Sequence, residues 1–256
     1  MKGFKAFIAK EIREFIRTKR LMILSGIFVI VGIMNAAIAK LTPKFLEMMA
    51  KELEEQGITL GAVNVTSMDA WSQFVKNIPT ALIVLLIMFS GIYTSEYSKG
   101  TLIPLLTNGL SRSTVVFSKL VVMLLSWSLG LCLCFGITYF YSDFYWDNSV
   151  VNELFFGAFC WWLFGTFLIS CIVFFSSIAG SAVQVILGTG AVYFVMTLIC
   201  MFSKVKKYLP VILTDTIPLY KGELEPKEYY RAVIITVLLS LILVVSALPL
   251  THKRQL

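Results

Sequence analysis

Residues 154–175 read LFFGAFCWWLFGTFLISCIVFF, and this run without a charged side chain decides the class of fold. A helix of roughly 20 apolar residues crosses a hydrocarbon core about 30 Å thick. We place the span that contains this run at about 151–175. A tight turn through 176–181 joins it to a second apolar run, at about 182–202. The two runs therefore predict a pair of transmembrane helices.

Four further runs of the same kind lie outward from this pair. We place these spans at about 21–39, 78–95, 115–141 and 232–250. Pro79 falls in the first turn of the second span, where its missing N–H costs little. Outside the six spans no stretch is long enough to build a separate soluble core. The sequence predicts an all-α polytopic membrane protein in which residues 1–256 form a single domain.

Composition supports this class and excludes others. The chain is 58% hydrophobic and only 14% charged, whereas soluble domains carry about 25% charged residues. The net charge of +7 comes from basic residues that flank apolar spans, so topology and anionic lipid explain it better than nucleic acid. The five cysteines lie inside apolar spans without paired or metal-ligand spacing, and we expect neither a disulfide nor a bound metal.

The N-terminal segment, residues 2–20, has the pattern of a basic amphipathic helix. Its apolar face holds Phe4, Phe7, Ile8, Ile12, Phe15 and Ile16. Seven lysines and arginines, including Arg13 and Arg17, occupy the rest. Such a helix lies in the membrane interface with its apolar face among acyl chains. The alternative is a helix that docks on protein along one edge.

Basic residues also predict the orientation of the chain. The cluster in the N-terminal helix favours a cytoplasmic N-terminus, and an even number of spans then leaves the C-terminus on the same side. The connector 96–114 becomes cytoplasmic, and 40–77 and 203–231 become outer segments. In the first outer segment Lys44–Gln56 has the composition of a short surface helix. In the second, Leu209–Leu219 is apolar enough for a re-entrant element.

The centres of the spans lack Asp, Glu, Lys, Arg and His. Ion-coupled transporters keep such residues in the membrane as relays, despite a cost of roughly 2.5–3.5 kcal/mol each. The chain also lacks an H-E-x-x-H pair, and its single histidine is His252 in the tail. We therefore expect no catalytic site in this chain, and energy for any transport has to come from a partner.

The connector between the second and third spans is short and amphipathic. Asn108-Gly109 marks a turn, and Ser111 or Ser113 can cap the third helix. Its apolar face, which a cytoplasmic partner could grip, holds Leu102, Ile103, Leu105 and Leu106. The alternative is an interfacial loop whose leucines contact only lipid. Its two flanking charges, Glu96 and Arg112, either pair with each other or are solvated separately.

The order of residues in this connector resembles the signature of ABC-2 type permeases. In that pattern a Glu ends the second span, a basic-Gly-Thr stretch, a Leu pair and a Ser-Arg follow, and a Lys opens the third span. The matching positions here are Glu96, Gly100, Thr101, Leu105, Leu106, Ser111, Arg112 and Lys119. Asn108-Gly109-Leu110 departs from the pattern, because relatives often have a Pro before the Ser-Arg.

The resemblance implies an ABC-2, type V exporter-like, fold in which two permeases pair around a central path, and the second permease is either another copy of this chain or a close paralogue. Each docks on a separate cytoplasmic ATPase, which binds ATP and Mg²⁺, since this chain lacks a phosphate-binding G-x-x-x-x-G-K-[ST] loop. The ATPase-coupling residues would be Glu96, Lys99, Gly100, Thr101, Leu102, Leu105, Leu106 and Arg112. The interfacial helix would contribute Phe4, Phe7, Ile8, Arg13, Phe15 and Arg17.

Short single-domain permeases of this type resemble bacterial exporters of peptide toxins and antibiotics, including lantibiotic-immunity and phenol-soluble-modulin exporters. We therefore expect a multi-pass protein of the bacterial cell membrane that exports amphipathic peptides and confers self-immunity. Two alternatives remain open. One is another ABC-2 task, such as export of drugs, sodium or lipid-linked glycan. The other is a non-transporting scaffold or sensor, which would purify without an ATPase.

Overall fold

The computed structural model describes residues 2–54, 64–98, 100–101, 103–107 and 109–253. Within these ranges the regular structure is helical, without strands. Six of the helices are long and apolar enough to cross a membrane, which confirms the predicted fold class. These are α2 (Arg20–Glu54), α3 (Ser67–Ser98), α5 (Arg112–Tyr145), α6 (Leu154–Ile178), α7 (Ala182–Ile199) and α10 (Pro226–Lys253).

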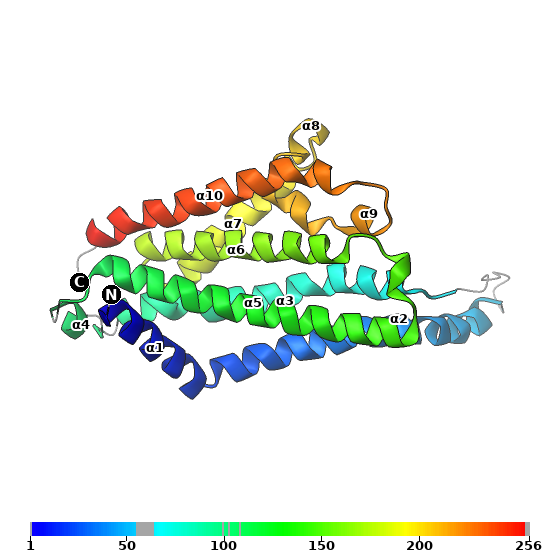
Figure 1. Cartoon of the computed structure of the whole chain (residues 1–256), viewed down its shortest axis with the longest axis horizontal. Coiled ribbons are helices and arrows are strands. Elements are labelled where there is room, and N and C mark those ends of the chain that lie inside the picture. Colours follow the sequence, from blue (N-terminus) through cyan, green and yellow to red (C-terminus); the bar gives the residue numbers. More distant parts are fainter. Residues whose placement is uncertain (1, 55–63, 99, 102, 108, 254–256) are drawn as a thin grey trace.

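The long helices form two layers (Figure 1). The first layer consists of α2, α3, α5 and the N-terminal helix α1 (Lys2–Arg17). The second layer consists of α6, α7 and α10, in which α7 and α10 each pack on α6. Helix α4 (Ile103–Thr107) and both chain ends lie at the same end of the bundle. The connector and the two ends therefore share one side of the molecule.

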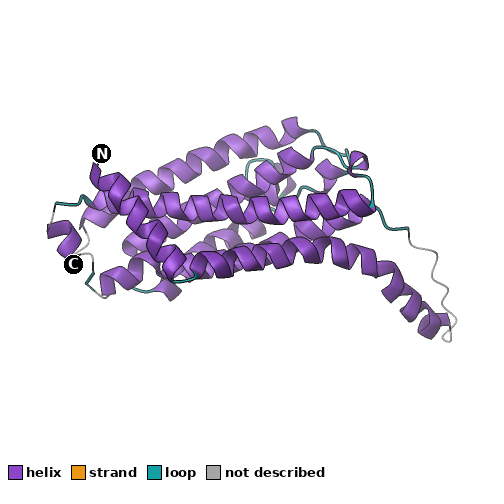
Figure 2. Ribbon diagram, turned by 60° about the horizontal axis from the view of Figure 1, so that its bottom comes forward, coloured by secondary structure: helices purple, strands orange, loops and turns teal. Residues whose placement is uncertain are grey.

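Helix α2 is longer than the first predicted span. It continues through Pro43 to Glu54, so the separate surface helix expected over Lys44–Gln56 is, as far as Glu54, the C-terminal part of the same helix. Directly before the proline, the Thr42 hydroxyl donates to the Ile38 carbonyl at 2.7 Å, so polar contacts continue along this stretch of backbone. The C-terminal part of α2 extends beyond the other helices (Figure 2).

Helix α3 also begins earlier than the predicted span. Its first turn is closed by Asp69, whose carboxylate accepts from the Thr66 backbone N–H at 2.8 Å, while the Asp69 N–H donates back to the Thr66 carbonyl. Reciprocal contacts of this kind satisfy exposed donors at a helix start. Pro79 therefore lies inside α3, and its predicted place in the first turn was wrong.

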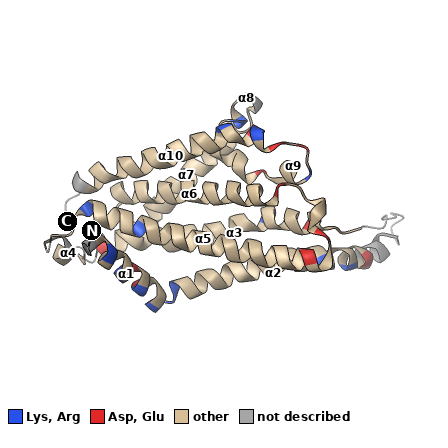
Figure 3. Ribbon diagram, in the orientation of Figure 1, with Lys and Arg blue, Asp and Glu red and all other residues tan. Residues whose placement is uncertain are grey.

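The core runs along the facing sides of both layers. Its largest fully buried side chains include Trp71, Trp127 and Trp161. Helix α6 is the central element. In its most apolar 18-residue stretch 67% is buried, whereas in the corresponding stretch of α7 only 11% is buried. Charged side chains gather toward the two ends of the bundle (Figure 3), as six membrane spans require.

The segment between α7 and α10 folds back onto the second layer. It contains α8 (Ser203–Lys206), the 3-10 helix η2 (Pro210–Thr214) and α9 (Ile217–Tyr220). Leu213, Leu219 and Tyr220 are fully buried. The Tyr220 ring packs so closely on α6 that a side chain at Gly157 would lie 2.3 Å from it. Protein covers these apolar residues, as a re-entrant element requires, and their depth in a membrane stays a prediction.

Candidate coupling site

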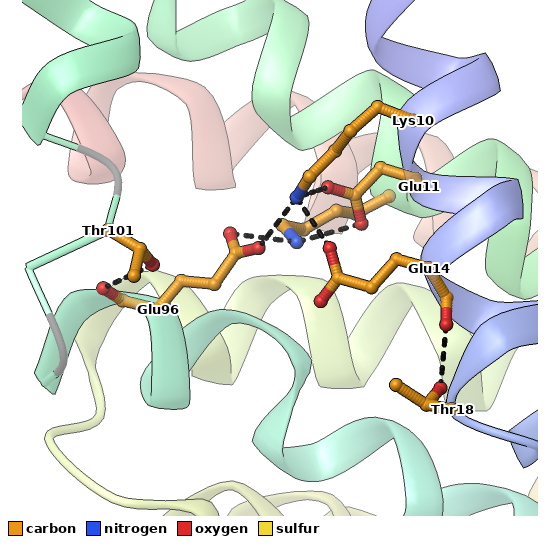
Figure 4. Close-up of polar contacts among 7 residues, drawn as sticks. Lys10, Glu11, Glu14, Thr18, Glu96 and Thr101 are labelled. Carbon is orange, nitrogen blue, oxygen red and sulfur yellow. Dashed lines mark hydrogen bonds and ion pairs between the residues drawn. The ribbon is translucent and has the colours of Figure 1, made fainter.

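A fully buried lysine joins three helices at the end of the bundle that carries the connector. Figure 4 shows two carboxylates at this place, Glu11 and Glu96, which point toward each other. Lys119, near the start of α5, pairs through its Nζ with Glu11 of α1 at 3.0 Å and with Glu96 of α3 at 2.9 Å. Glu11 is itself buried and Glu96 nearly so. We call these three residues the buried triad. It ties α1, the end of α3 and the start of α5 together.

A second lysine extends this network toward the surface. The Lys10 ammonium lies 3.0 Å from Glu11, 2.7 Å from Glu14 and 3.4 Å from Glu96. Burial alone would lower the pKa of Lys10, but its hydrogen bonds to Glu14 and Glu11 outweigh that effect and raise the pKa above its usual value. The hydrogen bond from Lys10 in turn lowers the pKa of Glu14. Both groups are therefore charged at neutral pH.

Aromatic side chains close the triad from the membrane side. The Lys119 ammonium lies 5.7 Å from the centre of the Tyr93 ring, a distance at which a ring face attracts a cation. The Tyr93 hydroxyl donates to the Val116 carbonyl at 2.9 Å, which holds α3 on α5. Phe15 of α1 packs on Phe89 of α3, with 5.6 Å between ring centres. The charges thus lie at the edge of a packed core.

The same carboxylates could suggest a metal site. Single oxygens of Glu11, Glu14 and Glu96 lie within 4.8 Å of one another. However, the Lys10 ammonium contacts all three, and Lys119 contacts two of them. The protein's own cations occupy the place that a metal ion would take. The arrangement is therefore suited to holding helices together rather than to binding a cofactor.

A cavity of about 550 Å³ adjoins the network. Charged side chains of α1, α2, α3 and α5 make up nearly half of its lining residues, and Thr101 and Pro104 of the connector also border it. The Thr101 backbone N–H donates to the Glu96 carbonyl at 3.2 Å, which attaches the connector directly to a member of the triad. The connector is therefore hydrogen-bonded to the same residue whose carboxylate pairs with Lys119.

The connector has the local geometry that its sequence predicts. Gly100 and Gly109 have φ of +65° and +86°, values that a residue with a Cβ rarely adopts. The short helix α4 lies between them, with Ile103 44% exposed. Ser111, rather than Ser113, is the N-cap of α5, and its hydroxyl accepts from the Thr114 N–H at 3.2 Å.

Not all of the predicted coupling residues come together. Glu96 joins the triad, whereas the Arg112 guanidinium donates to the Thr251 carbonyl of α10 at 2.8 Å. Neither a Glu96–Arg112 pair nor two separately solvated charges describes this arrangement, because Lys119 and Lys10 neutralise Glu96 from inside the bundle. Lys99 and Leu102 lie outside the described residues. Leu105 and Leu106 belong to α4, but their side chains are not described.

The interfacial helix is docked more deeply than expected. Phe7 and Phe15 are only 5% exposed and face protein rather than acyl chains. Phe4 and Ile8 are half-buried, and Arg13 and Arg17 are exposed. The physical reason is Glu11, which lies one turn from each buried phenylalanine on the same face and cannot enter lipid unpaired. Of the two predicted environments, docking on protein is the one observed for this face.

Sequence reasoning missed the pairing of Glu11 with Lys119. Glu11 is separated from Lys119 by 108 positions, and the sequence identified Lys119 only as the lysine of the connector pattern. One signal was present, since Glu11 interrupts the apolar face of an otherwise basic helix. An acid between two phenylalanines at helical spacing indicates a buried partner of opposite charge.

A second cavity lies in the apolar part of the bundle. It measures about 420 Å³ and lies where α3 meets α6 and α7. Its lining is mainly apolar, with Leu82, Leu86 and Phe164 among the side chains. Hydroxyl groups of Ser90, Thr189 and Tyr193 interrupt this surface. We call this cavity the apolar groove.

Fold and site together define a helical membrane protein with a charged attachment for its connector at one end. Residues 6–209 match the model of the ABC-2 family transporter proteins, and the chain belongs to this family. It is therefore a multi-pass permease component of an ABC transporter, and in this family the ATPase is a separate subunit. No curated protein and no solved structure matches the chain.

Proposed function

We propose that this chain is the permease of an ATP-driven exporter, and that the buried triad transmits the movement of a cytoplasmic ATPase to the spans. The supporting observation is that Lys119 joins α1, α3 and α5 directly above the connector. A force on α4 or α1 then moves the two spans α3 and α5 together as one rigid body. Lys99, Leu102, Leu105 and Leu106 remain part of the proposed grip on the ATPase.

The proposed orientation places this end of the molecule in the cytoplasm of a bacterial cell. The N-terminus, the C-terminus and α4 share one end. Arg13 and Arg17 are exposed there, where anionic headgroups attract them. An ATPase, which needs cytoplasmic ATP, can reach α4 only in this orientation.

The proposed cargo is an amphipathic peptide, such as a toxic peptide against which the cell protects itself. The apolar groove supports this proposal, because its lining is largely apolar and its few hydroxyls offer hydrogen bonds. Ligand sites usually combine such surfaces with a small number of polar groups. Drugs or lipid-linked glycan are the alternative cargoes of the same path.

A second copy of the chain would complete the path. Helix α7 exposes Val183, Leu187 and Phe194 along one apolar stripe at helical spacing. A span with so little buried surface gains packing when another helix covers it. We therefore expect a homodimer, with α7 as part of the contact between the permeases.

The coupling role is tested with the connector leucines. The L105D/L106D variant should still fold but lose the ATPase during purification, because charged side chains remove the apolar grip. ATP turnover of the purified complex in proteoliposomes should fall at least about tenfold, the equivalent of 1.4 kcal/mol of interaction. The L105M/L106M variant is the matched control and should keep both properties.

Cargo is tested in the same proteoliposomes. An amphipathic helical peptide should accumulate in inside-out vesicles only with ATP, whereas a scrambled peptide of identical composition should not. If the chain purifies without an ATPase and moves no peptide, it is a scaffold or sensor. If ATP turnover responds to a lipophilic drug but not to the peptide, the peptide is the wrong cargo. The proposed role as an exporter permease then still stands.

A further inference from the structure

The two layers meet along two seams of opposite character. One seam runs between α5 and α6, and the other runs between α3 and the pair α6–α7. Since the layers touch along both, any relative movement has to be larger at the seam that is less tightly held. The side chains at each seam indicate which one that is.

The α5–α6 seam is fastened by reciprocal hydrogen bonds. The Trp127 indole of α5 donates to the Trp162 carbonyl of α6 at 2.9 Å. The Trp162 indole donates back to the Ser128 hydroxyl of α5, also at 2.9 Å. In a membrane interior no water replaces such bonds when they break, so the two helices resist separation here.

Close contact strengthens the same seam. Trp127 lies flat against Gly165 of α6, where a Cβ would be 2.3 Å from the indole ring. Gly130, one turn further along α5, receives the Phe28 ring of α2 in the same way, which tightens α5 within the first layer. Small residues that admit a large ring produce tight helix contacts in membranes. The α5–α6 seam is therefore both bonded and interlocked.

The opposite seam contains the apolar groove. Two of the hydroxyls that line it donate within their own elements, Ser90 to the Ile87 carbonyl of α3 and Thr214 to the Val211 carbonyl of η2. The Thr189 hydroxyl of α7 is buried and has no hydrogen-bond partner among the described residues. Apolar contacts slide at little cost because they have no preferred direction.

We infer that Trp127, Ser128, Trp162 and Gly165 form a pivot about which the second layer turns relative to the first. The turn widens or narrows the apolar groove while the α5–α6 distance stays fixed. These four are positioning residues, because they lie across the bundle from the groove and act on its width. The inference rests on the proposed function only where it assigns cargo to the groove.

The pivot is tested with paired spin labels in a variant lacking the five native cysteines. One pair, at Ile83 and Ile186, spans the groove, and the other, at Leu129 and Phe159, spans the α5–α6 seam. In nanodiscs containing this chain alone, the distance distribution across the groove should be roughly twofold broader than that across the seam, as expected for a hinge. Distance distributions of equal width for the two label pairs would overturn the pivot.

Two substitutions that remove the same bond sharpen the test. Trp162→Phe and Ser128→Ala should each broaden the seam distribution to a similar extent. Ser126→Ala is the control, because the Ser126 hydroxyl donates within α5 to the Val122 carbonyl and should leave the width unchanged. If the distance distribution across the seam keeps its width in both Trp162→Phe and Ser128→Ala, the inference is contradicted.

With the ATPase bound, ATP should shift the groove distance and leave the seam distance in place. Trp162→Phe should keep ATP turnover but lose peptide transport, since the layers no longer turn about a fixed line. A shift at the seam rather than the groove refutes the pivot even if transport is intact. If no ATPase binds, the proposed function fails, and the nanodisc widths still decide the pivot.

Discussion

At the scale of single residues, the buried triad is the feature of this permease with a large free-energy cost of removing charges from water. Removing an ammonium and two carboxylates from water costs several kcal/mol per ion, and only close pairing offsets that cost. Lys119 has both partners within 3.0 Å. The arrangement is therefore strongly sensitive to the loss of one member, because the others are left charged and buried.

Replacement of Lys119 by Met should lower stability by about 3–5 kcal/mol. The drop is measured as a lower unfolding temperature in detergent. Lys10→Met is the matched control and should cost about 1 kcal/mol or less, because Lys10 is 42% exposed. The triple variant K119M/E11Q/E96Q should recover much of the loss, since it leaves no unpaired charge. Equal effects of Lys119→Met and Lys10→Met would contradict the buried pairing.

The pH dependence of the outer part of the network follows from Lys10 and Glu14. The pKa of Glu14 is lowered, so its stabilisation is complete above the ordinary value of about 4.3 and is lost as pH falls through the lowered pKa. The pKa of Lys10 is raised, so its contribution is complete below about 10.4 and is lost at higher pH. The stability difference between wild type and Glu14→Gln should be constant from about pH 5 to 9 and vanish in stronger acid.

At the scale of helices, a polar cluster joins three elements within the bundle. The Asn35 amide of α2 donates to the Thr138 hydroxyl of α5 at 3.0 Å. The Asn77 amide of α3 donates to the Asn35 carbonyl oxygen at 2.9 Å. Asn35 is fully buried, so the first layer is tied by the triad at one end and by this cluster further along.

Asn35→Leu should weaken the packing of α2 on α3 and α5. Interhelical hydrogen bonds in membranes contribute about 0.6 kcal/mol on average and up to about 1.7, so the expected loss is roughly 1–2 kcal/mol. Unfolding in mixed micelles with increasing SDS measures it. Thr42→Val is the control, because the Thr42 hydroxyl donates only within α2. A variant as stable as wild type would show that the cluster adds nothing.

At the scale of the whole molecule, the first layer is held together by the triad and the Asn35 cluster. It faces a second layer in which one helix, α7, is largely uncovered. The proposed dimer explains why such a span is tolerated. Gly190 is exposed on α7 at the border of the apolar groove, and a Cβ there would meet no atom within 4 Å. The position is therefore free within one chain and available to a second.

Gly190→Leu should leave the single chain folded and dissociate the dimer, because the larger side chain holds the α7 helices apart. Light scattering in detergent should give half the mass of the wild-type particle. Gly188→Leu is the contrasting variant. Its side chain would meet the Phe175 ring at 2.6 Å, so it should destabilise the chain itself. A Gly190→Leu dimer of unchanged mass would exclude this face.

The sequence by itself determined the fold class and the composition of the connector. Uncharged runs such as 154–175 have to be helices in lipid, because an unpaired backbone cannot enter a hydrocarbon layer. Gly109 and Ser111 adopt their expected local roles, since turns and caps depend on neighbours in the chain. These features require no knowledge of what lies across the bundle.

Only the tertiary structure decided which distant residues meet. It placed Lys119 beside Glu11 and Glu96, put Pro79 inside α3, and bonded Trp127 to Trp162. Helix periodicity gives the face that a residue occupies, but not the partner opposite that face, because the partner depends on how the long helices are ordered and rotated. A charge near a membrane boundary looks the same in sequence whether water or a carboxylate neutralises it, and packing makes that choice.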